Sequence, residues 1–300
     1  MDLVLAVDGG GTGCRAALAD RTGRVLARAT GGPANIASDT KAAMRNLRAV
    51  CDQVLQGVDP AGCHVVMGLA GANAAGSVAA LRAGLPFADL RIETDARIAV
   101  AGALQGADGI VAVLGTGSVF ARQTAGRMHI IGGHGLTLGD EASGGWLGRG
   151  LLSAAARAAD RLGPSSPLLD AVLGELGGLP GVIGFSLTAR PTDFARFAPR
   201  LFDTADPVAL ALLAQAEADI AGAVAVLQAG ADLPVVFLGS LGHAMASRFA
   251  DRFARQPDRP QPDRPQPDRI HPDRPWQLRA ALGNALDGAL WLGLQTVAAR

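Results

Sequence analysis

Short apolar runs alternate with longer amphipathic segments along the first third of the chain, which is typical of a sheet covered by helices. Three strand-like runs come first, and helical and strand-like segments then alternate. The spacing predicts strands near residues 3–7, 15–19, 25–29, 64–69 and 91–94, and helices near 40–55, 77–83 and 96–104. This order predicts a mixed sheet.

The same order begins again near residue 109, which indicates an internal structural duplication. Strands are predicted near 110–114, 119–123, 128–131 and 234–238, and helices near 140–162, 167–176, 192–202, 207–228, from 243, and 284–299. The helix at 207–228 consists mostly of Ala, Val and Leu, so we expect it to be buried. We therefore predict two α/β domains, residues 1–107 and residues 108–300.

Residues 256–275 break this pattern with repeated Pro-Asp-Arg units. Proline at this density prevents both helix formation and pairing in a sheet, and Ile270 is the only large apolar residue present. We expect a solvated insertion in the C-terminal domain, either extended or disordered. No feature of the repeat indicates a partner.

Charge and cysteine content narrow the classes of protein. The chain has 27 Lys plus Arg and 27 Asp plus Glu, so nothing suggests a nucleic-acid or membrane-surface partner. No apolar run approaches the roughly 18 residues of a membrane span, and Asp2 and Asp8 stand where a signal peptide would be apolar. Three scattered cysteines are typical of reduced thiols rather than a disulfide framework. We expect a cytoplasmic protein, and the sequence leaves a homodimer open.

The most informative stretch is the end of the first strand, Asp8-Gly9-Gly10-Gly11-Thr12. Glycines allow a tight turn whose backbone N–H groups approach an anion, and an aspartate beside them suits Mg²⁺. A strand follows rather than a helix, and the Gly-Lys-Ser/Thr of a Walker A loop is missing. The alternative interpretation is a plain hairpin with a glycine turn.

Two aspartates stand at the start of predicted helices and have two interpretations each, a structural cap or a functional carboxylate. Asp95 comes directly after the strand at 91–94 and precedes a helix, and Asp140 precedes the helix that runs to about residue 162. Aspartate is a common helix N-cap, so capping alone explains either position. Asp95, at the carboxyl end of its predicted strand, also lies where ligands of open α/β sheets bind.

Together, the loops resemble those of the N-acetylglucosamine kinases, the sugar-kinase branch of the BadF-BadG-BcrA-BcrD type ATPases. The resemblance covers residues 3–146 and then, thinly, 239–240 and 284–290. It rests on Asp8-Gly9-Gly10-Gly11-Thr12, Thr94-Asp95-Ala96, Gly115-Thr116-Gly117-Ser118, Gly139-Asp140-Glu141-Ala142-Ser143 and Gly239-Ser240. It implies two ribonuclease-H-like (actin-like ATPase) domains with mixed sheets and a cleft between them.

The resemblance also implies ATP and Mg²⁺ as cofactors. Gly10, Gly11 and Thr12 match the first phosphate loop of the family, and Asp8 the residue that orients Mg²⁺. Gly115 and Gly117, with Thr116 between them, match the second phosphate loop. Gly239 and Ser240 match the turn against adenine.

For the sugar, the resemblance implies that Asp95 is the general base and that Asn35, Thr116 and Asp140 contact the substrate. Two positions depart from the family pattern. His134 stands where a tryptophan is usual, and Ala142 replaces a glycine. Both lie beside the expected sugar pocket, so the amino sugar stays open among N-acetylglucosamine, glucosamine and N-acetylmuramic acid.

The expected activity is ATP-dependent phosphorylation of an amino sugar, first of all N-acetylglucosamine or glucosamine at the 6-hydroxyl. An ATPase that activates a radical dehydratase or reductase is the alternative, but it needs cluster-binding cysteines, and none lies in the second half. A sugar-responsive regulator would need a DNA-binding module, and no helix-turn-helix pattern is present. A protein that only binds sugar would not need two phosphate loops.

Overall fold

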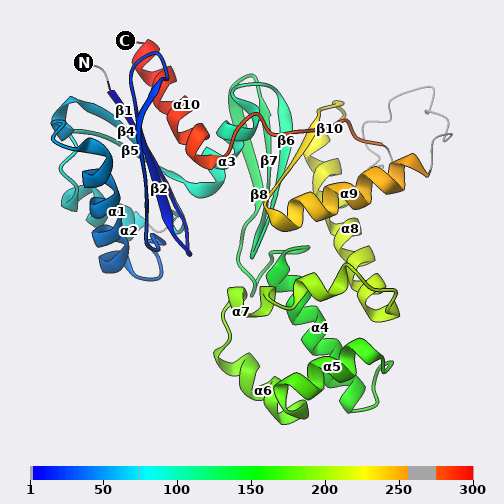
Figure 1. The fold of residues 1–300 in the computed structure, drawn as a ribbon. Coiled ribbons are helices and arrows are strands. Elements are labelled where there is room, and N and C mark those ends of the chain that lie inside the picture. The colour runs from blue at the N-terminus through cyan, green and yellow to red at the C-terminus, as the bar shows by residue number, and fades with distance from the viewer. Residues whose placement is uncertain (1–2, 74, 256–274, 300) are drawn as a thin grey trace. The chain divides into compact units, whose positions relative to one another are not determined.

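The computed structural model describes residues 3–73, 75–255 and 275–299. The chain divides into two compact units, each described by itself below (Figure 1). Unit 1 comprises the residues up to Ala107 together with those from Ala280 onward, and unit 2 spans Asp108–Arg279. The break at residue 107 coincides with the predicted boundary.

Unit 1 is built on a five-stranded sheet of order β3-β2-β1-β4-β5. Its strands are β1 (Leu3–Gly9), β2 (Cys14–Ala19), β3 (Val25–Gly31), β4 (Cys63–Leu69) and β5 (Asp89–Thr94). The first three strands are antiparallel neighbours, and β4 and β5 run parallel to β1. This is the mixed sheet that the sequence predicts.

Alternate residues of these strands face two apolar layers. Leu5 and Val7 pack in the cluster that contains the buried face of α1 (Thr40–Leu55), and α2 (Ala75–Gly84) follows on the same side. Val4 and Ala6 face the cluster formed with α3 (Asp95–Leu104) and α10 (Ala285–Ala298). Helices therefore cover both faces of the sheet, because neither face of these strands is polar.

The C-terminal helix α10 corrects the predicted domain boundaries, because it belongs to unit 1 rather than to a domain 108–300. It packs so closely on α3 that a Cβ at Gly102 would lie 2.0 Å from the Asn284 carbonyl oxygen. A Cβ at Gly288 would lie 1.9 Å from the Ile98 carbonyl oxygen. Only glycine allows the two helices to approach so closely. This contact joins residues that are far apart in the chain, so it cannot be predicted from local sequence patterns.

Unit 2 repeats the architecture with a second five-stranded sheet, of order β10-β9-β6-β7-β8. Its strands are β6 (Gly109–Leu114), β7 (Ser118–Thr124), β8 (Arg127–Gly132), β9 (Val235–Leu238) and β10 (Leu278–Arg279). Again three antiparallel strands lead, and a parallel strand joins the first of them. The predicted duplication is confirmed, while the two-residue β10 is too short to predict.

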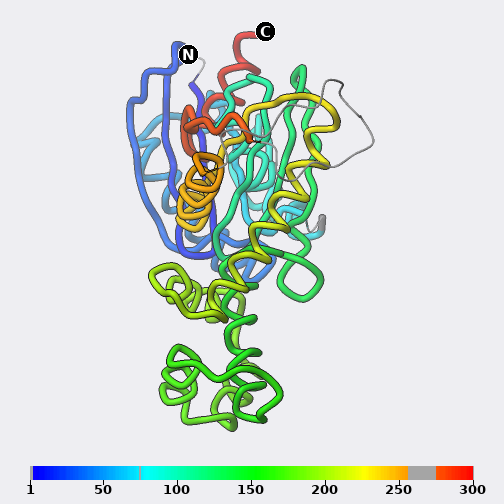
Figure 2. Tube along the Cα trace, turned by 90° about the vertical axis from the view of Figure 1, so that its right-hand side faces the viewer, coloured from blue at the N-terminus to red at the C-terminus, as the bar shows by residue number. Residues whose placement is uncertain are grey.

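The helices of unit 2 are α4 (Gly144–Ala159), α5 (Pro167–Leu176), α6 (Gly178–Thr188), α7 (Pro191–Ala195), α8 (Pro207–Gln228) and α9 (Ser240–Ala254). α5 and α6 lie at the end of α4 that points away from the sheet (Figures 1 and 2). The sequence does not predict α6. The predicted helix 192–202 is instead the short α7 and a 3-10 turn, Ala198–Leu201.

Helix α8 is less buried than its composition suggests. Its buried residues include Leu213, Ile220 and Val224, but Leu210 is 46% exposed and Val226 53%. Within the described part of the chain, α8 is the one helix long and apolar enough to cross a membrane, and the bent α5–α6 pair adds at most a second. A partly buried core helix passes the same test, so this indicates little.

Residues 256–274 of the proline repeat lie outside the described residues, so the expectation for them stays a prediction. The chain that follows is anchored in unit 2. The Trp276 ring lies 4.6 Å from the Phe249 ring and 5.5 Å from the Phe253 ring, centroid to centroid. These contacts fix the start of the return to β10.

Candidate functional site

The first glycine-rich stretch forms a tight turn between β1 and β2. The Gly10 N–H donates to the Gly13 carbonyl oxygen at 2.9 Å, which leaves Gly11 and Thr12 exposed at the apex. The Ala34 N–H donates to the Gly10 carbonyl oxygen at 2.8 Å, and the Ala70 N–H to that of Gly9 at 2.8 Å. The turn is thus joined to two neighbouring loops.

Asp8 lies next to this turn and has a partner that the sequence analysis missed. Arg15 is opposite Asp8 in the β1–β2 ladder, and its guanidinium forms an ion pair with the Asp8 carboxylate. The Arg15 side chain is 50% exposed and that of Asp8 15%. The register of the β1–β2 ladder pairs the two positions, and the sequence analysis predicted no register for this hairpin.

Asp95 is not the N-cap of α3. Thr94 is the cap, and its hydroxyl accepts a hydrogen bond from the Arg97 N–H at 3.2 Å. Asp95 is the first helical residue, and its Oδ1 accepts from the Ala96 N–H at 2.9 Å. The capping alternative for Asp95 is therefore wrong.

The electrostatics of Asp95 are compatible with a proton acceptor. Burial by surrounding protein is the largest cause that raises the pKa of Asp95, although its side chain still reaches solvent. The negative charge of Asp8 raises this pKa further, and the Ala96 N–H opposes both. A carboxylate with a raised pKa is a stronger base.

Asn35 lies in the loop joined to the glycine turn. Its Oδ1 accepts from the N–H groups of Ala37 at 3.0 Å and Ser38 at 3.2 Å. These two bonds form a local turn of the kind that asparagine favours. They engage the side-chain oxygen in the fold, so the amide nitrogen is the group suited to a ligand.

In unit 2, the second glycine-rich loop lies at the start of α4. The carbonyl oxygens of Gly115 and Thr116 accept from the N–H groups of Gly144 at 2.8 Å and Gly145 at 3.0 Å. The Thr116 side chain is exposed. The Ser118 hydroxyl donates to the Glu141 carbonyl oxygen at 2.7 Å, which joins the loop to the segment that holds Asp140.

Asp140 is buried at 7% exposure and is not the cap of α4, so the prediction of a capping role is corrected. Ser143 caps α4, and its hydroxyl accepts from the Trp146 N–H at 3.1 Å. Burial raises the pKa of Asp140, and hydrogen bonds from the backbone of Ser118 and Gly135 oppose this. The carboxylate therefore joins two loops and has a fixed orientation.

The two departures from the family pattern lie around Asp140. The positive charge of His134 acts to lower the pKa of Asp140. Ala142 is fully buried at φ +62°, a left-handed conformation that costs an L-residue roughly 1–2 kcal/mol. A glycine at this position would avoid that strain. The alanine is instead held in the strained conformation by the surroundings in which its methyl group is buried.

The Gly239-Ser240 turn opens α9 beside the second glycine loop. Gly239 has φ +87°, and a Cβ there would lie 2.2 Å from the Leu114 carbonyl oxygen. Only glycine fits between the end of β6 and the start of α9. Unit 2 thus brings residues 115–117, Asp140 and the Gly239 turn to one end of its sheet.

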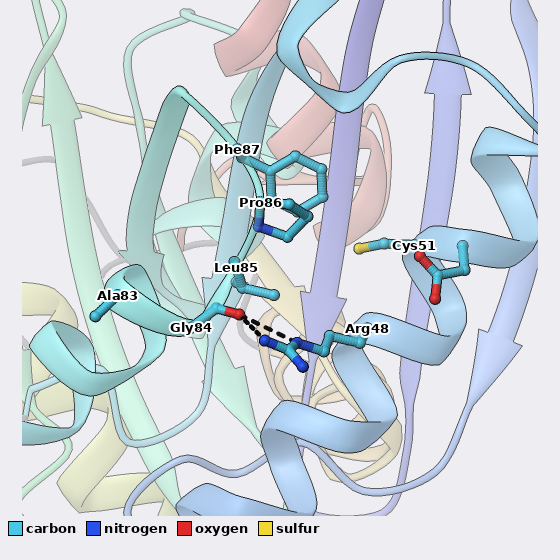
Figure 3. Close-up of a pocket in the computed structure, with 8 residues that line it drawn as sticks. Arg48, Cys51, Ala83, Gly84, Leu85, Pro86 and Phe87 are labelled. Carbon is cyan, nitrogen blue, oxygen red and sulfur yellow. Dashed lines mark hydrogen bonds between the residues drawn. The ribbon is translucent and has the colours of Figure 1, made fainter.

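Unit 1 also has a hollow away from these residues. A cavity of about 460 Å³ lies between α1 and the turn before β5, and there the Arg48 guanidinium donates to the Gly84 carbonyl (Figure 3). The turn precedes β5, whereas Asp95 follows it, so the cavity lies at the opposite end of that strand. Burial raises the pKa of Cys51, which lines it, to about 12, so this thiol stays neutral. The cavity holds none of the candidate residues.

A profile of the BadF/BadG/BcrA/BcrD ATPase family matches residues 5–252. The chain belongs to this family. The match includes both glycine-rich loops, Asp95, Asp140 and the Gly239 turn. It confirms the resemblance seen in the motifs, and the two mixed five-stranded sheets agree with the fold class that this resemblance implies.

Individual relatives are similar over much of the chain. The glucosamine kinase GspK of Vibrio cholerae serotype O1 is 33% identical over 73% of this chain and 78% of its own length. An N-acetylmuramic acid/N-acetylglucosamine kinase of Clostridium acetobutylicum is 29% identical over 56% of this chain and 58% of its own. A protein from Chromobacterium violaceum, provisionally assigned as an N-acetylglucosamine kinase, has a crystal structure that matches this one with a TM-score of 0.82. The two sequences are 30% identical, and the match covers 98% of this chain and 99% of the other.

Proposed function

We propose that this protein is a cytoplasmic ATP-dependent kinase that phosphorylates an amino sugar. The substrates to test first are N-acetylglucosamine and glucosamine, with the 6-hydroxyl as acceptor. The observation that carries the proposal is the repeated architecture: each unit presents a glycine-rich loop directly after its first strand. The similarity to amino-sugar kinases supports the substrate class.

The donor groups present suit Mg²⁺. Among the described residues no group of three or more His, Cys, Asp or Glu side chains gathers as a metal site. Mg²⁺ in kinases needs no such cage, because one carboxylate together with phosphate and water oxygens suffices. Asp8 would hold the ion, which neutralises phosphate charge when bound.

The chain's own residues then have distinct tasks. The exposed backbone of residues 10–12 and of residues 115–117 binds phosphate oxygens, and the Gly239-Ser240 turn lies against adenine. Asn35 and Asp140 bind sugar hydroxyls. Asp95 accepts the proton of the attacking hydroxyl, a role that typically contributes about 10²–10⁴-fold in rate.

The alternative of an ATPase that activates an iron–sulfur enzyme finds no support in the cysteines. All three, Cys14, Cys51 and Cys63, are buried in unit 1. Burial is the largest cause that raises the pKa of each thiol, which opposes the thiolate form that a cluster requires.

The proposal is tested by measuring ATP consumption with a panel of amino sugars, hexoses and muropeptide sugars. We expect turnover that depends on an amino sugar and a phosphorylated sugar as product. ATP hydrolysis that is independent of every sugar would contradict the proposal and favour an ATPase.

A further inference from the structure

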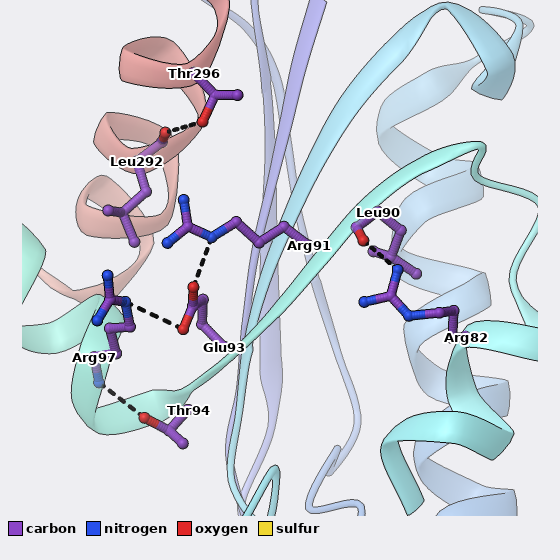
Figure 4. A network of polar contacts seen from close by, with 8 residues as sticks. All are labelled: Arg82, Leu90, Arg91, Glu93, Thr94, Arg97, Leu292 and Thr296. Atoms are coloured by element: carbon purple, nitrogen blue, oxygen red, sulfur yellow. Dashed lines mark hydrogen bonds and ion pairs between the residues drawn. The ribbon is translucent and has the colours of Figure 1, made fainter. Parts of the chain in front are cut away.

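A cluster of charged side chains lies where β5 passes into α3, on the side of the sheet that faces α10 (Figure 4). Glu93 is its centre, with a side chain only 18% exposed. Its Oε1 accepts a hydrogen bond from Arg91 Nε at 2.6 Å. Its Oε2 lies 3.1 Å from Arg97 Nε in an ion pair that spans one helical turn.

Arg97 is held a second time, by its backbone. Its N–H donates to the Thr94 hydroxyl, the cap of α3. Two contacts therefore close the same five-residue turn, one between side chains of Glu93 and Arg97 and one between the Thr94 side chain and the Arg97 backbone. Asp95 lies inside this turn.

The Asp95 carboxylate depends on the turn for its direction. In the described part of the chain, its hydrogen bonds come from the N–H groups of Ala96 and of Asp95 itself. These donors belong to the turn, so the carboxylate points where the backbone of residues 93–97 directs it. A change in the Glu93–Arg97 contact would move it.

The strand register places this cluster in line with the first glycine loop. Glu93 is opposite Gly68 in the β4–β5 ladder, and Gly68 is opposite Asp8 in the β1–β4 ladder. Residues that are direct partners project to the same face, so Glu93 and Asp8 occupy one row of the sheet. The turn that carries Asp95 is thereby held in register with the loop that carries Asp8.

We propose that Glu93 and Arg97 are positioning residues, which hold the start of α3 so that Asp95 meets the acceptor hydroxyl. The inference rests on the proposed function, in which Asp95 is the base. Neither residue touches the reacting groups. Their effect is geometric, and displacement of a reacting group by about 1 Å can cost 10²-fold in rate.

The test is Glu93→Gln, which keeps the shape of the side chain and removes its charge. Unit 2 offers a matched control, because Arg248 Nε also donates to Glu217 Oε1 at 2.6 Å, and Glu217 is 14% exposed. We expect Glu93→Gln to lower kcat by about 10- to 100-fold while both KM values change by less than about twofold. Glu217→Gln should leave kcat unchanged, although it should shift the melting temperature by about as much as Glu93→Gln does.

Two further variants separate positioning from a loss of folding. Arg97→Met removes the cation opposite Glu93 and should lower kcat as Glu93→Gln does. Arg97→Lys keeps a cation there, so its kcat should lie between those of Arg97→Met and the unaltered protein. The double variant Glu93→Gln/Arg97→Met should be no slower than the slower of the two single variants, because each substitution removes the same contact between Glu93 and Arg97.

A kcat for Glu93→Gln equal to that of Glu217→Gln, or additive losses in the double variant, would overturn the inference. Failure of the proposed function looks different. In that case the unaltered protein itself would show no turnover that depends on a sugar, and the inference would fall with it.

Discussion

Arg15 lies directly opposite Asp8 in the β1–β2 ladder, and its guanidinium forms an ion pair with the Asp8 carboxylate. The charge of Asp8 in turn raises the pKa of Asp95. The first glycine loop and the proposed base are therefore coupled electrostatically within unit 1. A change of charge at Asp8 or Arg15 should therefore alter the pKa of Asp95.

Substitutions of Asp8 and of Arg15 are expected to shift the pKa of Asp95 in opposite directions. Asp8→Asn removes a negative charge and should lower the pKa of Asp95, whereas Arg15→Gln removes the neutralising cation and should raise it. The measurement is a carboxyl ¹³C NMR titration of Asp95 in the protein without nucleotide or metal. Shifts of the same sign in both variants would show that Asp95 responds to altered packing and not to charge.

Asn35 should discriminate sugar from nucleotide binding. Asn35→Asp keeps the oxygen that accepts from Ala37 and Ser38, so the turn survives, but it loses the amide donor. We expect sugar affinity to fall by about 1–3 kcal/mol and ATP affinity to change little. Calorimetric titrations with each ligand check this, and equal losses for both ligands would place Asn35 outside the sugar pocket.

The proline repeat and the residue after it should behave differently. Replacing residues 256–275 with a short Gly/Ser linker should change the free energy of unfolding by less than about 1 kcal/mol, because loop closure depends weakly on length. Trp276→Ala should cost about 2–4 kcal/mol, since the ring packs on Phe249 and Phe253. Chemical denaturation measures both, and a large loss with the linker would mean that the repeat packs on the fold.

The local pattern of the sequence predicts much of this fold. The bounds of α1, α5 and α8 follow from helical spacing, and the structure has them at the predicted residues, each preceded by an Asp or Ser cap. The duplicated strand order also follows, because each apolar run ends in a glycine-rich turn. These features are fixed by residues close together in the chain.

Long-range contacts explain what the sequence did not reveal. Helix α6 is missed because its glycines and proline, in Gly178–Thr188, read as a loop, while its packing on α5 is a tertiary property. The place of α10 depends on Gly102 and Gly288, which are far apart in sequence. At the site, Thr94 and Ser143 take the capping roles assigned to Asp95 and Asp140, since a hydroxyl one or three residues away competes equally well.

The stability of an Asp95→Asn variant follows from the sign of the pKa shift. The pKa of Asp95 is raised in the folded protein, so ionisation costs folding stability as pH rises above the value of the unfolded chain. Removing the charge should therefore leave the melting temperature at neutral pH unchanged or higher. Loss of activity in this variant would not reflect unfolding.

The most direct test of the account is the rate of sugar-dependent phosphoryl transfer by Asp95→Asn. Thr94 remains to cap α3, so the variant should fold and bind Mg²⁺–ATP as the unaltered protein does. The account predicts that it transfers phosphate to the best amino sugar about 10²–10⁴ times more slowly. Turnover close to that of the unaltered protein would contradict the account, because Asp95 would then not be the base.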